Sequence, residues 1–331
     1  MHALVQLSAF TVVDGASTPG GAATRDRYQE VFDLADAAEE GQLNALWIAE
    51  HHFHDGGLCP APPVLLAACA ARTRRIRLGV LVSVLPFHNP IEVAEEYAMV
   101  DQVSAGRLNL GLGSGYLATE LGGFGVDPAT KRERFDRAYE VVLRALQGEP
   151  VAWGGAEVRL NVRPFQAPYP PVWVAVQRRE AIPFVGRRGV SIALVPYATL
   201  SGPEELTQEL AEYRAALPGG TRGHASVALH LYAGDHPERA RAALQRYLDS
   251  RLAHQSTFFA QKSAAHPEAV TVEAIERQGF ALFGSAEEVA EALHRFSDRG
   301  VDEVLGMFDF GALHPRDVRG SVLSLGPRMS P

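Results

Sequence analysis

Three side chains that can transfer protons follow one apolar run near the N-terminus. The run at 44–49 ends in Glu50, His51 and His52, and a glycine-containing loop at 54–57 comes next. A short apolar run bounded by a loop is typical of a buried strand. Carboxylates and imidazoles are the usual side chains of general acid–base catalysis. Glu50 and His51 are therefore the first candidates for a site.

The two adjacent histidines are not expected to share a role. Neighbouring residues of a strand point to opposite faces, so only one of them can face a site at the strand end. We assign that place to His51 and a structural role to His52.

A metal site is the alternative use of these histidines. His52 and His54 are spaced like paired metal ligands, and Glu50 or Cys59 could complete a ligand set. No later cluster of His and Asp residues at a strand end supplies the remaining ligands. We therefore predict that the site holds no metal.

A glycine-rich run follows a later apolar strand. It reads Gly-Leu-Gly-Ser-Gly-Tyr over 111–116, and the residues at 117–125 are expected to be loop. Glycines let the backbone approach a ligand, and successive N–H groups there can bind an anion. A tight turn at the end of a strand would use the same glycines, so the run alone leaves both readings open.

A third candidate is the pair Gln177 and Arg178, which comes between an apolar strand and a helix. An arginine beside a helix N-terminus is well placed to bind a phosphate or carboxylate. A solvated charge at the start of a helix would have the same sequence.

The elements that position these residues alternate between strand and helix. Eight strands are predicted near residues 4, 46, 80, 110, 174, 192, 229 and 305. Strand–helix alternation predicts a parallel sheet, and eight repeats in a chain of this length predict a closed (β/α)₈ TIM barrel. Residues 1–331 form one domain in this reading, with a lid or insertion at 255–283, where the periodicity is weak. In such a barrel all strand ends face one site.

Composition narrows the class of function. The 331 residues carry a formal net charge of −8 without a dense Lys/Arg run, which disfavours nucleic acid or an anionic membrane surface as a partner. No apolar run approaches the roughly 20 residues of a membrane helix, and the first residues lack the pattern of a signal peptide. The only two cysteines, Cys59 and Cys69, fit a reducing cytoplasm.

The order of several motifs resembles the bacterial luciferase-like flavin-dependent monooxygenases. The similarity runs along nearly the whole chain. The motifs that carry it are Ala49-Glu-His-His-Phe53, Arg75-Ile-Arg-Leu-Gly-Val80, Leu85-Pro86 with His88-Asn-Pro90, Asp101-Gln-Val-Ser-Ala-Gly-Arg107, Gly111-Leu-Gly-Ser-Gly-Tyr116, Phe124-Gly125, Pro171-Val-Trp-Val-Ala175 and Gly284-Ser-Ala-Glu-Glu-Val289.

This resemblance implies a (β/α)₈ barrel that binds reduced FMN, delivered by a separate flavin reductase, and forms a homodimer. It implies oxygenation of a small molecule by dioxygen through a flavin 4a-hydroperoxide. Aromatic residues suggest that this molecule is hydrophobic; the candidates are Phe10, Phe53, Tyr116, Tyr197, Phe258 and Phe259. The alternatives are a deazaflavin (coenzyme F420)-dependent hydride-transfer oxidoreductase and a flavin-binding barrel without catalysis.

The resemblance also implies roles for individual residues. His51 falls on the catalytic histidine, Glu50 lies beside the flavin ring, and a non-proline cis peptide under the ring falls at Leu81–Val82. Members often have Arg at the position of Ser114 and small hydroxyl residues at the position of Gln177 and Arg178. We therefore expect Arg178 to supply the cation for the phosphate. The remaining predicted phosphate-site residues are Gly113, Ser114, Gly115, Tyr116 and Gln177.

Replacement of His51 by Ala tests the catalytic assignment. The variant is expected to fold like the native protein and to consume reduced FMN and dioxygen with little oxygenated product, because the proton-transferring group is lost. Product formed per reduced flavin consumed is the quantity to measure. A near-native yield would contradict the assignment.

Overall fold

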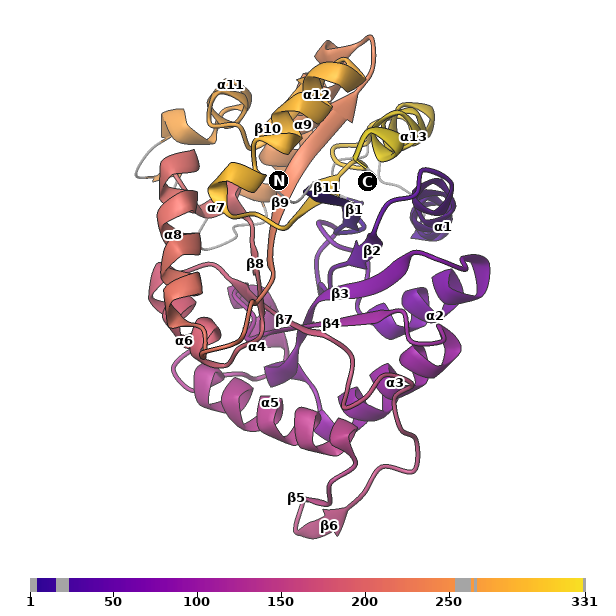
Figure 1. Ribbon diagram of the computed structural model, residues 1–331, viewed down its shortest axis with the longest axis vertical. Coiled ribbons are helices and arrows are strands. Elements are labelled where there is room, and N and C mark those ends of the chain that lie inside the picture. Colours follow the sequence, from indigo (N-terminus) through magenta and orange to yellow (C-terminus); the bar gives the residue numbers. More distant parts are fainter. Residues whose placement is uncertain (1–4, 16–23, 254–262, 265–266, 330–331) are drawn as a thin grey trace.

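The computed structural model describes residues 5–15, 24–253, 263–264 and 267–329, and its strands close into a parallel barrel (Figure 1). β1 pairs with β2 on one side and β11 on the other, and the β8–β9 pairing closes the ring. The barrel strands are β1 (Gln6–Thr11), β2 (Ala45–Ile48), β3 (Arg77–Val84), β4 (Leu108–Gly113), β7 (Val172–Val176), β8 (Ser191–Leu194), β9 (Ala225–Ala233) and β11 (Glu303–Met307).

Helices surround this barrel, as the (β/α)₈ prediction requires (Figure 1). The helices are α1 (Thr24–Glu40), α2 (Pro62–Arg72), α3 (Pro90–Val103), α4 (Ala118–Gly123), α5 (Lys131–Gln147), α6 (Ile182–Arg187), α7 (Pro196–Thr199), α8 (Pro203–Ala216), α9 (Pro237–Ala253), α11 (Val272–Arg277), α12 (Ala286–His294) and α13 (Pro315–Met329). Short 3₁₀ turns are η1 (Leu85–Phe87), η2 (Arg179–Ala181), η3 (Pro267–Val270) and η4 (Ser297–Arg299). Within the described residues, no helix is long and apolar enough to cross a membrane.

Local sequence explains where several helices begin and end. The Asn89 side chain accepts a hydrogen bond from the backbone N–H of Ile91 at the start of α3. Ser285 and Glu288 form a reciprocal capping box on α12. Such caps satisfy N–H groups that the first turn leaves without a partner. They fix the first turns of α3 and α12.

The structure differs from the predicted elements in four places. The segment at 117–125 was wrongly predicted as loop. It contains the short helix α4, which ends in two glycines, and glycine is unfavourable in a helix. Residues 281–284, at the end of the predicted lid, form β10, which pairs with 230–233 of β9 beyond the part that pairs with β8. A two-stranded hairpin, β5 (Val151–Trp153) and β6 (Ala156–Val158), projects beyond α5 (Figure 1). The first strand, predicted near residue 4, is β1 and spans Gln6–Thr11. Residues 254–262 and 265–266 of the predicted lid lie outside the described residues.

A polar network fills one part of the barrel interior. The Glu303 carboxylate is fully buried and accepts hydrogen bonds from the hydroxyl of Ser8, from Asn44 Nδ2 at 2.8 Å and from Ser226 Oγ at 2.9 Å. Burial would raise the pKa of Glu303, but His224 and these hydrogen bonds lower it overall. A buried carboxylate is tolerated because it is fully hydrogen-bonded. The network joins four segments of the barrel.

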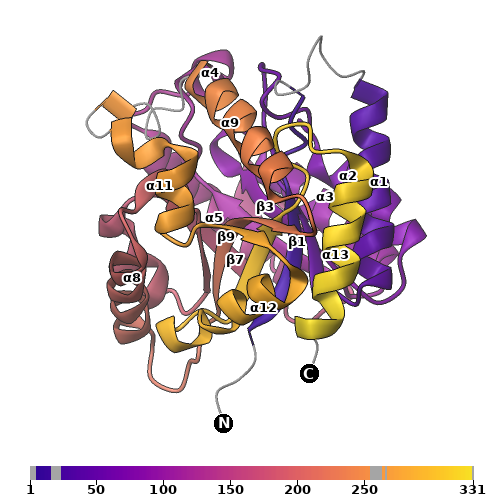
Figure 2. The ribbon, with the colours of Figure 1, turned by 90° about the horizontal axis from the view of Figure 1, so that it is seen from above.

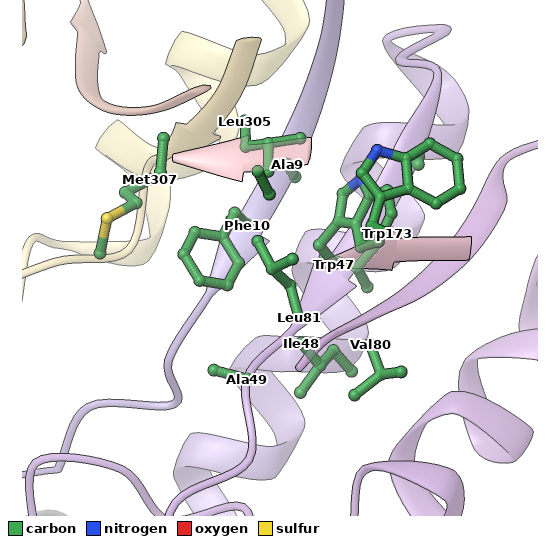
Figure 3. Close-up of a cluster of buried hydrophobic side chains, with 14 of the residues drawn as sticks. Ala9, Phe10, Trp47, Ile48, Ala49, Val80, Leu81, Trp173, Leu305 and Met307 are labelled. Atoms are coloured by element: carbon green, nitrogen blue, oxygen red, sulfur yellow. The ribbon is translucent and has the colours of Figure 1, made fainter. Parts of the chain in front are cut away.

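Two indoles pack next to this network. Trp173 donates from Nε1 to Ser226 Oγ at 3.1 Å, and its ring meets Trp47 edge to face with centroids 5.0 Å apart. Figure 3 shows these two rings side by side, with Phe10, Leu81 and Met307 lying further along the interior. Gly79 leaves room for Trp47, because a Cβ there would lie 2.2 Å from Cε3 of the indole. The interior is therefore packed up to the level of Phe10.

Replacement of Gly79 by Ala is expected to lower the free energy of unfolding by about 1–3 kcal/mol, since the added methyl group forces Trp47 out of place. Urea denaturation measures this change. Gly320→Ala is the matched control: its Cβ meets nothing within 4 Å in α13, so the helix gains about 0.5–1 kcal/mol. Equal stability of native protein and Gly79→Ala would show that the contact is not tight.

Candidate active site

A cavity of about 630 Å³ opens where the barrel strands end. Its walls come from the ends of several strands and from α4, α5, α6, α7 and α9. Both α4 and α9 reach the upper end of the molecule in Figure 2. All ten residues that the sequence predicts for the site line this one cavity; they are Glu50, His51, Leu81, Val82, Gly113, Ser114, Gly115, Tyr116, Gln177 and Arg178. The size is that of a cofactor or substrate pocket, for which about 300–1,000 Å³ is usual.

His51 is held by a carboxylate that the sequence analysis missed. Its Nδ1 lies 2.9 Å from Oε1 of Glu120 on α4, and the same oxygen accepts the backbone N–H of His52 at 2.9 Å. His54 Nε2 lies 3.3 Å from it. Glu120 is 69 positions from His51 in a segment expected to be loop, so no spacing connects the two. Its only signal was an isolated acid within an apolar and glycine-rich stretch.

The charges of this pair are set by burial and by each other. Burial lowers the pKa of the His51 imidazole, and the hydrogen bond and charge of Glu120 offset part of that effect. Burial would raise the pKa of Glu120, but the histidines and the His52 N–H lower it to about 2. At neutral pH the carboxylate is ionised and His51 is neutral. Its Nδ1–H donates to Glu120, which leaves Nε2 as the proton acceptor.

Glu50 belongs to a separate cluster. Its Oε1 accepts from His52 Nε2 at 3.0 Å and from His88 Nε2 at 2.7 Å, and its Oε2 accepts the backbone N–H of Val84 at 3.2 Å. Burial would raise the pKa of Glu50, but these partners lower it overall. His52 is buried beside Phe124, with ring centroids 4.7 Å apart, and does not line the cavity. The prediction that only one of the two adjacent histidines faces the site is confirmed.

Both clusters contain possible metal ligands. The ligand atoms of Glu50, His52 and His88 lie within 4.8 Å of one another, and those of His51, His54 and Glu120 do likewise. In each cluster the carboxylate oxygens already accept hydrogen bonds from the imidazoles. A metal would have to replace those bonds. The absence of a metal stays a prediction.

The floor of the cavity is apolar. Leu81, Val82, Phe10 and Met307 line it, and the peptide bond Leu81–Val82 is cis, as the resemblance implied. Gly113 faces Val82 at close range: a Cβ on this residue would lie 2.3 Å from Val82 Cγ2. The glycine is therefore needed to let β4 lie against β3 at the floor.

Four cationic side chains line another part of the cavity. They are Arg178, which sequence analysis proposed, and Lys131, Arg132 and Arg188, which it did not. Lys131 Nζ donates to the carbonyl of Gly115 at 2.6 Å. Burial and the charge of Arg178 lower the pKa of Lys131. This concentration of positive charge beside the glycine-rich backbone suits a phosphate.

Two of these cations lie over the aromatic ring of Phe184. The guanidinium carbons of Arg132 and Arg188 lie 3.9 and 3.8 Å from the centroid of its ring, and Arg188 Nη2 also donates to Asp136 at 2.9 Å. A cation over an aromatic face is held by the ring's electrons. In the sequence these arginines have the pattern of ordinary exposed charges on a helix. The sequence therefore does not predict them as site residues.

Of the aromatic candidates for the substrate region, Phe10, Tyr116 and Tyr197 line the cavity. Phe53 was wrongly included: its side chain is 64% exposed and lies outside the lining. Phe258 and Phe259 lie outside the described residues.

Fold and site together define a (β/α)₈-barrel protein with a buried histidine–carboxylate pair in a mostly apolar cavity. A profile of the luciferase-like monooxygenase family matches residues 5–303. The chain belongs to this family.

Curated relatives share different portions of the chain. Two uncharacterised proteins of Sinorhizobium fredii are 37% and 34% identical over 58% and 48% of this chain, and the matches span 57% and 46% of their own lengths. The chain thus matches about half the length of these relatives. The oxygenase component of a flavin-dependent trigonelline monooxygenase from Acinetobacter baylyi is 26% identical over 86% of this chain and 84% of its own.

Solved structures share the fold. The monooxygenase RslO1 from Streptomyces bottropensis superposes with a TM-score of 0.82, at 24% identity over 98% of both chains. The oxygenating constituent of 3,6-diketocamphane monooxygenase from Pseudomonas putida, solved with FMN, has a TM-score of 0.80 at 18% identity over 99% of both chains. An F420-dependent secondary alcohol dehydrogenase has a TM-score of 0.77 at 15% identity, covering 99% of this chain and all of that one.

Replacement of Glu120 by Gln is expected to lower the pKa of His51 further, because the hydrogen bond and charge that favour the imidazolium are weakened. The pKa can be read from the ring carbon signals of ¹³C-labelled histidine during a pH titration. Glu291→Gln, at an exposed position, serves as the control and leaves the His51 signal unchanged. A rise in the His51 pKa in Glu120→Gln would contradict the assigned pairing.

Proposed function

We propose that this protein is the oxygenase of a two-component flavin monooxygenase, which uses reduced FMN and dioxygen to oxygenate a small molecule. The observation that carries the proposal is the joint lining of one cavity by the His51–Glu120 pair, the Leu81–Val82 floor and the cationic group around Arg178. Family membership supports the same class of reaction.

The cavity fits a phosphorylated flavin in three respects. Its floor is apolar and suits a flat ring, and Gly113 and Gly115 present backbone to the cavity lining. Arg178, Lys131 and the nearby arginines suit a phosphate. The oxygenating constituent solved with FMN has the same fold.

When bound, reduced FMN would supply the electrons that activate dioxygen, and the protein supplies position and electrostatics. The neutral His51 offers Nε2 to take up or return a proton at the reacting oxygen, while Glu120 fixes the tautomer. Phe10, Leu81 and Val82 present apolar surface that keeps water from the same region.

The partners follow from this role. We infer a separate flavin reductase, in line with the relative described as an oxygenase component, and a hydrophobic substrate that contacts Phe10, Tyr116 and Tyr197. A homodimer remains our expectation. A cytoplasmic setting is consistent with Cys59 and Cys69, which are both free thiols.

The phosphate part of the proposal can be tested by comparing FMN with riboflavin. Arg178→Ala and Lys131→Ala are each expected to weaken FMN binding about tenfold or more, because a charge-assisted contact with the phosphate is lost. Riboflavin has no phosphate, so its affinity is expected to change little. Arg239→Ala, an exposed residue on α9, is the matched control. Unchanged FMN affinity in both variants would overturn this assignment of the phosphate site.

The reaction class is tested by oxygen consumption with reduced FMN, a flavin reductase and a panel of aldehydes, ketones and polycyclic compounds. Oxygenated product that depends on His51 supports the proposal. Hydride transfer with reduced F420 and no oxygen incorporation would instead identify the deazaflavin-dependent alternative. Flavin binding without turnover of either kind would identify a non-catalytic barrel.

A further inference from the structure

One charged residue in the cavity has no role in the site described so far. Arg251 lies in the last turn of α9, lines the cavity together with Tyr116, Tyr197 and Tyr247, and is 8% exposed. It comes from the helix after β9, whereas the cations assigned to the phosphate follow β4 and β7. A second positive centre therefore faces the same cavity from a different element.

The contacts of Arg251 leave part of its guanidinium unsatisfied. Nη2 donates to the carbonyl of Gly56 at 2.7 Å, and the guanidinium carbon lies 4.8 Å from the ring centroid of Tyr247. Nε is buried without a hydrogen-bond partner. No carboxylate among the described residues lies within ion-pair distance of it, and the buried Asp14 acts on its charge only from farther away. A buried cation is costly unless an anion or several acceptors compensate for it.

Its position brings this charge to the reacting end of the cavity. Gly56 belongs to the loop that follows His51, and the next residue, Gly57, packs on the imidazole: a Cβ there would lie 2.5 Å from His51 Cβ. The Tyr116 ring is centred 6.4 Å from that of His51. A group held by Arg251 would therefore lie near the proton-transferring residue.

The surrounding tyrosines add neutral hydrogen-bonding groups. The hydroxyls of Tyr197 and Tyr247 lie 3.1 Å apart, and burial raises the pKa of Tyr116 to about 12, so its phenol is uncharged at neutral pH. The cation is thus set among aromatic rings that carry no compensating negative charge. This arrangement fits an aromatic or apolar ligand with one anionic oxygen.

Building on the proposed function, we propose that Arg251 is the substrate-anchoring residue and that the substrate carries an oxyanion, either a carboxylate or an ionised phenol or enol. The guanidinium binds this oxygen where it lines the cavity, and the rest of the molecule packs on the cavity's apolar walls. The hydrophobic substrate of the proposed function then carries one anionic oxygen at its end beside Arg251.

Matched pairs of small probes test the inference without turnover. Benzoate is compared with benzamide, and 4-nitrophenolate with nitrobenzene, by calorimetric titration into protein saturated with oxidised FMN. The native protein is expected to bind at least one anion about tenfold or more tightly than its neutral partner. The pair that shows the preference tells whether the oxyanion is a carboxylate or a phenolate. Equal affinities within both pairs overturn the inference.

Variants then assign the preference to Arg251. Arg251→Met is expected to abolish it, whereas Arg239→Met on the exposed side of α9 retains it. Survival of the preference in Arg251→Met overturns the inference. If Arg251→Met does not fold, Arg251→Lys carries the test: it keeps the charge but loses the planar fork, so anion affinity falls while benzamide affinity is unchanged. Unchanged anion affinity in Arg251→Lys overturns the inference.

The same titrations separate this inference from the proposed function. If the protein forms no oxygenated product with reduced FMN and dioxygen but still shows a preference that depends on Arg251 when it is titrated without FMN, the anion site is upheld and the monooxygenase is rejected. Oxygenation of a neutral substrate at the native rate by Arg251→Met upholds the monooxygenase and rejects the anchor.

Discussion

Closure of the parallel sheet is the constraint on which the rest of this structure depends. Because all neighbouring barrel strands pair in parallel and the β8–β9 pairing closes the ring, every barrel strand points the same way and every strand ends at one opening. Residues that are more than a hundred positions apart, such as His51 and Arg178, therefore line one cavity. The buried Glu303 network and the Trp47–Trp173 pair fill the interior, so the cavity starts only at the level of Phe10.

Buried charge distinguishes the regions of this cavity. At His51, the nearby carboxylate of Glu120 compensates for burial and fixes the orientation of the imidazole. At Arg178 and Lys131, positive side chains gather beside backbone that can bind an anion. At Arg251, a guanidinium nitrogen remains without a partner. A low-dielectric site makes each of these differences large. The cavity thus contains a histidine–carboxylate pair, a group of four cations and a separate buried guanidinium.

Much of this could be predicted from local patterns. Apolar runs separated by helical stripes gave the barrel, because buried parallel strands and amphipathic helices have distinct periodicities. The strand-end position of His51 and the glycines at 111–116 indicated a site, and the order of motifs indicated the family. The prediction of a loop at 117–125 was wrong because the short helix α4 contains two glycines. Glu120 lies on this helix, so it was not predicted as a partner of His51.

The sequence by itself determined the fold class, the family and the residues at the strand ends, since these depend on short-range spacing. Tertiary structure alone decided the partners of those residues: Glu120 for His51, His88 for Glu50, and Lys131 beside Gly115. It also placed Arg251, which in sequence is one of several arginines along α9, inside the cavity. Charge pairing depends on distance in space and on burial, and neither can be read from separation along the chain.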